Sequence, residues 1–166
     1  MTTKGKTSIT LNVQEHNGAY RPASPDEIIH AAQTAISRRF RRGKALTSPA
    51  DSIDFMKLKL SHLEHEIFAV LWLDNRHRVI AFEELFRGTI DGASIYTREV
   101  VKSALTHNAA ACIIAHNHPS GVCDPSQADR TITKKIIDTL SLIDIRVLDH
   151  IVIGENAYSF AENGLI

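Results

Sequence analysis

Apolar and polar residues follow two different spacings along this chain, and each spacing predicts one kind of element. Unbroken apolar runs at residues 67–73 and 109–115 have the length of buried strands. Other segments combine a capping residue with helical apolar spacing and predict helices. The expected helices span residues 24–42, 48–63, 97–107 and 126–142. The expected strands span residues 66–74, 78–87, 109–115, 145–153 and 157–160.

The first two helices begin with the same signal. Ser24-Pro25-Asp26-Glu27 and Ser48-Pro49-Ala50-Asp51 each place a serine at the cap, a proline at the first helical position and acids in the first turn. Gly43 is expected to end the first helix, and the polar segment before residue 24 is expected to be loose. Because strands and helices interleave further on, the sequence predicts an α/β fold with a single mixed β-sheet and flanking helices. We therefore divide the chain into a loose N-terminal arm plus basic helix, residues 1–45, and the α/β domain, residues 46–166.

Composition fits one domain with no strong overall charge. The 166 residues, 43% of them hydrophobic, suffice for a single domain with a sizeable core. The 19 basic and 19 acidic residues cancel, so no overall positive field draws the protein to nucleic acid. Two cysteines are too few for a disulfide framework, and the N-terminus has no apolar signal region. No apolar run approaches ~18 residues, and a cytoplasmic location is expected.

One segment carries residues suited to chemistry rather than to packing. His116 and His118 are two positions apart, so an extended backbone points both imidazoles to the same side. They follow a predicted buried strand, and open α/β sheets bind ligands at the carboxyl ends of their strands. Asp129 comes in the first turn of the next predicted helix, after turn-forming residues that reverse the chain. Two histidines and a carboxylate make a zinc ligand set that leaves a fourth position for water.

Each part of this cluster also has a simpler interpretation. Ser126 and Asp129 fit an N-cap with an acid three residues later, which alone favours helix capping over metal binding. A His-x-His pair alone fits hydrogen bonding to neighbours about as well. His150 lies among apolar residues of a predicted strand and is expected to support the core or a ligand. Cys123, in the loop between the proposed ligands, could be a fourth ligand but is better explained as an ordinary loop cysteine.

The segment resembles the motif of a known family. His116-Asn117-His118-Pro119 followed by Ser126-x-x-Asp129 is similar to the JAMM metalloprotease motif. Asn117 replaces the usual Ser or Thr and the spacer is one residue shorter, and both departures match the RadC-like branch of that superfamily. Residues 97–105, 147–153 and 159–164 also resemble RadC proteins. The resemblance begins near residue 48 and does not reach the N-terminal third, where RadC proteins carry a helix-hairpin-helix domain that this chain is too short to include.

The resemblance implies a fold like that of JAMM proteins and cytidine deaminases, with zinc held by His116, His118 and Asp129. It also implies that Ser126 helps to stabilise an oxyanion and that an upstream glutamate is the general base. Glu66 directly precedes the apolar run 67–73, like the JAMM glutamate at the head of its first strand, and is favoured over Glu64. Both glutamates could instead be exposed charges at a helix-to-strand junction.

Two other interpretations fail on spacing. The consecutive residues His116-Asn117-His118 are not the HNH nuclease signature, whose three residues come from separate parts of a ββα-metal unit. Zinc deaminases use His-x-Glu and Pro-Cys-x-x-Cys, and Cys112 and Cys123 lie too far apart for the second motif.

Two functions of different classes remain. The first is a zinc-dependent hydrolase of a peptide or isopeptide bond, with an undefined substrate. The second is a non-catalytic RadC-type module that binds DNA or a protein partner and keeps a structural metal, for which Glu66 would be dispensable. Membrane binding is not expected.

A cluster of cations bears on the second function. Arg38, Arg39, Arg41 and Arg42 could contact nucleic-acid phosphates, which suits the DNA-repair association of the RadC name. The favoured explanation is a solvated helix end, whose cations complement the negative end of the helix dipole.

Overall fold

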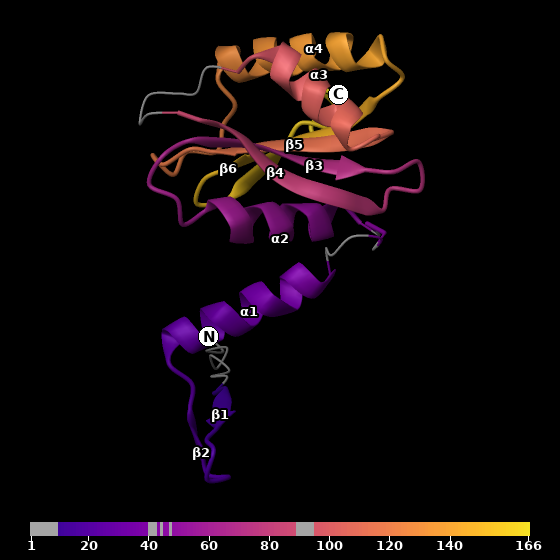
Figure 1. Cartoon of the computed structure of the whole chain (residues 1–166). Coiled ribbons are helices and arrows are strands. Elements are labelled where there is room, and N and C mark those ends of the chain that lie inside the picture. The colour runs from indigo at the N-terminus through magenta and orange to yellow at the C-terminus, as the bar shows by residue number, and fades with distance from the viewer. Residues whose placement is uncertain (1–9, 40–42, 44, 47, 89–94) are drawn as a thin grey trace, which may run out of the picture. The chain divides into compact units, whose positions relative to one another are not determined.

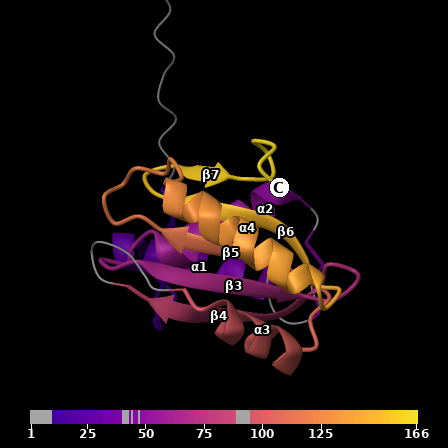
Figure 2. The same ribbon diagram turned by 90° about the horizontal axis from the view of Figure 1, so that it is seen from above.

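The computed structural model describes residues 10–39, 43, 45–46, 48–88 and 95–166. The chain divides into two compact units, residues 1–38 and 39–166, and Figures 1 and 2 together label their elements. Among the described residues, no helix is both long enough and apolar enough to span a lipid bilayer.

The N-terminal unit contains a short β-hairpin where the sequence predicted a loose arm. Strands β1 (Asn12–Gln14) and β2 (Tyr20–Pro22) pair antiparallel. The Asn17 side chain accepts a hydrogen bond from the Ala19 N–H at 2.9 Å, and Gly18 takes a positive φ of 84° in the turn. Polar contacts of this kind leave no apolar alternation in the sequence, which is why the pattern did not predict the strands.

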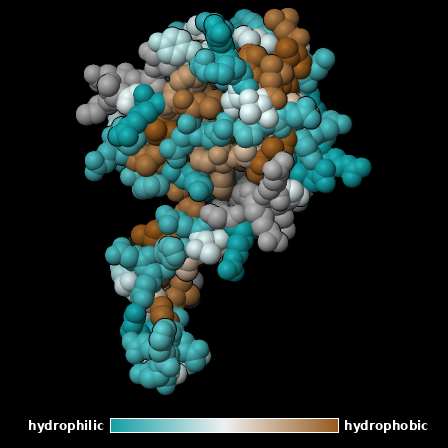
Figure 3. All heavy atoms as spheres, in the orientation of Figure 1, coloured by the Kyte–Doolittle hydropathy of each residue, from teal (hydrophilic) through white to brown (hydrophobic). Residues whose placement is uncertain are grey.

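Helix α1 (Pro25–Arg39) follows the hairpin. Its start is a capping box, because the Glu27 N–H donates to Ser24 Oγ at 3.3 Å and the Ser24 N–H donates to Glu27 Oε2 at 2.9 Å. Ile28 and Ile29 are exposed, and Figure 3 shows apolar atoms at the surface of this unit. The predicted end of this helix, residues 40–42, lies outside the described residues.

The C-terminal unit is built on one five-stranded sheet. Its strand order is β4-β3-β5-β6-β7, with β5 and β6 parallel and the other neighbours antiparallel. Helix α2 covers one face, and helices α3 and α4 cover the other (Figures 1 and 2). The elements are α2 (Pro49–Leu60), β3 (Ile67–Leu73), β4 (Val79–Arg87), α3 (Thr97–Thr106), β5 (Ala111–Asn117), α4 (Gln127–Ser141), β6 (Arg146–Ile153) and β7 (Ala157–Ser159). The predicted α/β class with a single mixed sheet is confirmed.

Apolar side chains are buried on both faces of the sheet, and one core cluster lies between the sheet and helices α3 and α4. Strands β3 and β5 are buried along their whole length, as their unbroken apolar runs predicted. Alternation along each strand sends Phe68, Cys112 and Ile114 into the cluster beneath these two helices. His116 has the same parity as Ile114, so its side chain emerges on the α4 side, while that of Asn117 emerges on the α2 side.

Candidate metal centre

Strand β5 presents the two histidines of the motif. The strand continues through His116 and Asn117 rather than ending at residue 115, because its ladders with β3 and β6 extend that far. The Nε2 atoms of His116 and His118 lie 2.9 Å apart. His116 is buried and His118 is partly exposed. The two imidazoles therefore meet at one point at the carboxyl end of the strand.

Asp129 completes a three-residue group. Its Oδ1 lies 3.3 Å from His116 Nε2, and its Oδ2 lies 3.7 Å from His118 Nε2. These three form a group of side chains that could hold a metal ion among the described residues, and Cys123 is not a member. A tetrahedral zinc ion with bonds of about 2.0–2.1 Å separates its ligand atoms by roughly 3.3–3.4 Å. The separations seen here bracket that value, so the donor atoms fit zinc in both type and spacing.

The loop between the histidines and α4 is tied to the end of β6. Gly121 has a φ of 84° and its carbonyl accepts a 2.8 Å hydrogen bond from the Glu155 N–H. A Cβ on Gly154 would lie 2.2 Å from that same carbonyl oxygen, so only glycine permits this approach. His118 N–H also donates to the Ile153 carbonyl at 2.7 Å. These contacts set where α4 begins relative to the histidines.

Ser126 and Asp129 form the capping box that the sequence also allowed. Ser126 Oγ accepts from the Asp129 N–H at 3.1 Å and donates to Asp129 Oδ2 at 2.6 Å, and the Ser126 N–H donates to Oδ2 at 2.7 Å. Burial alone would raise the pKa of Asp129. The hydrogen bond and charge of His116 and the two Ser126 donors outweigh burial and hold that pKa well below its usual value. Capping thus turns the carboxylate toward the histidines and keeps it ionised.

Glu66 lies outside the three-residue group but at the same edge of the sheet. It precedes β3, and β3 runs antiparallel to β5 with Phe68 opposite His116. Continuing this register places Glu66 beside His118, on the face covered by α4. Glu66 is partly buried, whereas Glu64, the other candidate base, is exposed.

Asn117 holds the backbone on both sides of Glu66. Its Oδ1 accepts from the Ile67 N–H at 2.8 Å, and its Nδ2 donates to the His65 carbonyl at 2.9 Å and to the Leu63 carbonyl at 3.3 Å. The Glu66 carbonyl itself accepts from the Gly88 N–H at 2.8 Å. The residue between the two histidines therefore fastens the segment that carries Glu66.

Two further residues lie beside the group. His150 on β6 is fully buried, and its Nε2 lies 2.8 Å from His116 Nδ1. Burial, followed by the charge of His116, pushes the pKa of His150 well below its usual value, so the ring is neutral. Thr133 on α4 lies 2.5 Å from His150 Nδ1. The sequence predicted that His150 supports the core or a ligand, and the β5–β6 ladder pairs it with Ile114, two residues before His116. No spacing in the sequence indicated Thr133.

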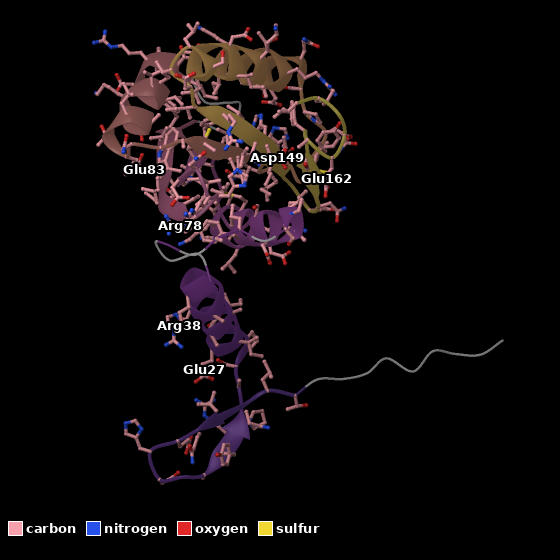
Figure 4. The ribbon with its side chains drawn as sticks, turned by 90° about the vertical axis from the view of Figure 1, so that its right-hand side faces the viewer. Glu27, Arg38, Arg78, Glu83, Asp149 and Glu162 are labelled. Atoms are coloured by element: carbon pink, nitrogen blue, oxygen red, sulfur yellow. The ribbon has the colours of Figure 1, made fainter. Side chains whose placement is uncertain are left out.

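The structure describes only part of the basic cluster formed by Arg38, Arg39, Arg41 and Arg42. Arg38 is exposed on α1 and is labelled in Figure 4. Arg39 ends the helix, and its side chain is outside what the structure describes, as are Arg41 and Arg42. The suggestion that these residues contact nucleic acid stays a prediction.

A mixed sheet with two histidines at a strand end and an aspartate on the following helix defines an α/β domain with a candidate metal site. Comparisons with known proteins agree. The family described as RadC-like JAB domain matches residues 46–165. The chain is 55% identical to a UPF0758 protein of Thioalkalivibrio sulfidiphilus over 149 residues, which make up 90% of this chain and 67% of that protein. It is also 55% identical to a UPF0758 protein of Vibrio cholerae over 137 residues, 82% of this chain and 87% of that protein.

The chain belongs to the RadC-like JAB domain family. The JAB superfamily includes metallohydrolases, and the His-His-Asp group supplies a place for a metal in this member. The names of the two relatives state no activity.

Proposed function

We propose that this domain is a zinc-dependent hydrolase of a peptide or isopeptide bond. The observation that carries the proposal is the convergence of His116 Nε2, His118 Nε2 and the Asp129 carboxylate at separations that suit zinc. Three protein ligands leave one position open, which is the arrangement of catalytic rather than structural zinc sites. When bound, zinc lowers the pKa of water to about 7 and polarises a carbonyl oxygen.

Glu66 is the proposed general base. The β3–β5 register, continued past Phe68 and His116, would bring Glu66 next to His118, where it could accept a proton from the attacking water and pass it to the leaving nitrogen. The bonds of Asn117 to the flanking backbone groups support this role, because a general base must keep a fixed position.

Ser126 is the proposed donor to the developing oxyanion. In the structure its hydroxyl proton is directed at Asp129 Oδ2. Donation to substrate therefore requires the hydroxyl to rotate away from this carboxylate, while the Ser126 N–H keeps its own bond to Oδ2. Such a donor is worth roughly 2.7–4 kcal/mol in the transition state.

The alternative is a non-catalytic module with a structural metal. The direction of the Ser126 hydroxyl toward Asp129, rather than toward an incoming group, favours it. The two functions differ in what they ask of Glu66, because a structural metal needs no base.

The test pairs two neighbouring glutamates. Glu66→Gln and the matched control Glu64→Gln are compared for zinc content and for hydrolysis of peptide and isopeptide libraries. The proposal predicts about one zinc per chain in both variants, a loss of turnover of roughly 10²–10⁴-fold in Glu66→Gln, and no loss in Glu64→Gln. Hydrolysis that survives Glu66→Gln unchanged would remove the mechanism, and a protein that binds zinc but cleaves no substrate would favour the structural metal.

A further inference from the structure

His150 is a buried polar residue that the proposed mechanism leaves without a task. It is fully buried on β6, and its ring stacks on Phe160 with a centroid distance of 4.7 Å and meets Phe68 edge-on at 6.0 Å. Its Nε2 faces Nδ1 of His116, which is the nitrogen on the far side of that ring from His118 and Asp129. His150 is therefore placed behind a ligand and cannot itself join the three-residue group.

We infer that His150 and Thr133 form a directional hydrogen-bond chain that sets the tautomer and orientation of His116. The inference rests on the proposed zinc site and concerns how that site is held. It follows from the positions of four groups in contact, since His116 bonds His150, His150 bonds Thr133, and Thr133 bonds the main chain of Asp129.

The direction of each bond follows from the first. A metal takes the unprotonated nitrogen of an imidazole, so binding through His116 Nε2 leaves the proton on Nδ1. That N–H donates to His150 Nε2 at 2.8 Å. Because His150 accepts this bond at Nε2, its own N–H is on Nδ1, the nitrogen that faces Thr133 Oγ1.

The hydrogen-bond chain ends at the main chain of Asp129, the third proposed ligand. His150 Nδ1–H donates to Thr133 Oγ1 at 2.5 Å, and the Thr133 hydroxyl donates to the Asp129 carbonyl at 2.5 Å. Each group uses its donor and its acceptor once, which leaves no choice in where the protons lie. The chain thus links His116 on β5 to the helical turn that carries Asp129.

The other histidine is held in a different way. His118 Nδ1 lies 2.7 Å from the carbonyl oxygen of Val122, a main-chain acceptor in the loop. This bond fixes the tautomer of His118 without a second side chain. Substitution of His150 or Thr133 can therefore remove the hydrogen bonds that hold His116 and leave the bond that holds His118 in place. The effect of the hydrogen-bond chain can thus be measured by itself.

Zinc affinity is the first readout. Partners that orient a ligating histidine typically change metal affinity by 10–100-fold when they are removed. His150→Phe keeps a ring but removes the acceptor, and a loss of about 10–100-fold is expected in chelator competition. His150→Gln supplies an amide oxygen as acceptor and should recover part of this loss. Thr133→Val should weaken binding, whereas the matched control Thr131→Val, which removes a similar bond from Thr131 to the Gln127 carbonyl on the same helix, should not.

The second readout is imidazole ¹⁵N NMR of the unsubstituted, zinc-loaded protein, which reports the tautomer of each histidine. If His150 only filled space in the core, its packing would not determine these tautomers. We expect the Nδ1–H tautomer for both His116 and His150. An Nε2–H tautomer of His150 would overturn the inference, as would wild-type zinc affinity in His150→Phe. Failure of the unsubstituted protein to bind zinc through His116 would instead sink the proposed function, so the two failures are distinguishable. Because the NMR measurement needs no substitution, a variant that does not fold leaves the test intact.

Discussion

At the residue scale, the contacts of Asn117 could not be predicted from the spacing of the motif. The motif placed it between two ligands, yet its side chain points to the opposite face of the sheet and bonds Leu63, His65 and Ile67. Those partners lie about 50 positions away in the sequence, so no local pattern connects them. The grouping of His116, His118 and Asp129 could be predicted because they fall within one short segment, and alternation along a strand orients both histidines. Glu66 needed the family resemblance as well, since only the β3–β5 pairing brings it to the same edge.

Replacing Asn117 by aspartate tests its role as an anchor of the Glu66 segment. The carboxylate can still accept from the Ile67 N–H but cannot donate to the two carbonyls, which are then left opposite a negative charge. We expect the free energy of unfolding to fall by about 1–3 kcal/mol and turnover to fall with it, with zinc affinity little changed. Urea unfolding and zinc titration measure these effects. Asn75→Asp, at an exposed turn, is the control, and equal behaviour of the two variants would refute the anchoring role.

At the element scale, the N-terminus of helix α4 serves both the stability of the helix and the candidate metal centre. Its N-cap Ser126 and its first-turn Asp129 satisfy backbone groups of the helix, and the same carboxylate faces the histidines. The sequence allowed capping and metal binding as alternatives, and the structure shows the cap beside a geometry that suits the metal. Elements formed by apolar runs were predicted closely, whereas the hairpin β1–β2 was missed because exposed polar turns hold it.

Ser126→Ala separates the cap from the chemistry. Loss of the hydroxyl removes an N-cap worth about 1 kcal/mol and one donor to Asp129, so modest weakening of zinc binding is expected. Removal of an oxyanion donor should cost much more, about 10²–10³-fold in turnover. The matched control is Ser48→Ala, which removes the cap of α2, where Ser48 Oγ accepts from the Asp51 N–H at 3.3 Å. Complete loss of zinc from Ser126→Ala would contradict this division of roles.

At the scale of the whole molecule, the site depends on the order of strands in one sheet. The start of β3 lies beside the end of β5 because the two are antiparallel, and β6 brings His150 behind His116 because it is parallel to β5. A sequence indicates the class of such a sheet, but the strand order that assembles residues 66, 116, 133 and 150 is a property of the folded chain. The balanced charge gives no overall field, so recognition of a partner must rest on local features.

Cys112, near the start of β5, reports on global unfolding. Burial raises the pKa of its thiol to about 12 from 9.0. As the pH rises, the thiol therefore loses its proton first in the unfolded chain. The contribution of Cys112 to the free energy of unfolding is complete below pH 9 and is lost as the pH rises toward 12. At 1.36 kcal/mol per unit the loss is about 4 kcal/mol, an upper figure for a buried group. Denaturant unfolding of the wild type and of Cys112→Ala across this range measures it. A wild-type protein that declined no more steeply than the variant would contradict the assignment.

Anomalous diffraction from crystals of the zinc-loaded protein would locate the metal and the Glu66 side chain in one measurement. We expect one zinc ion bonded to His116 Nε2, His118 Nε2 and a carboxylate oxygen of Asp129 at about 2.0–2.2 Å. We also expect the Glu66 carboxylate to lie within hydrogen-bond reach of the group that fills the fourth position. A zinc ion bound elsewhere, or a Glu66 side chain turned away from the metal, would contradict these expectations.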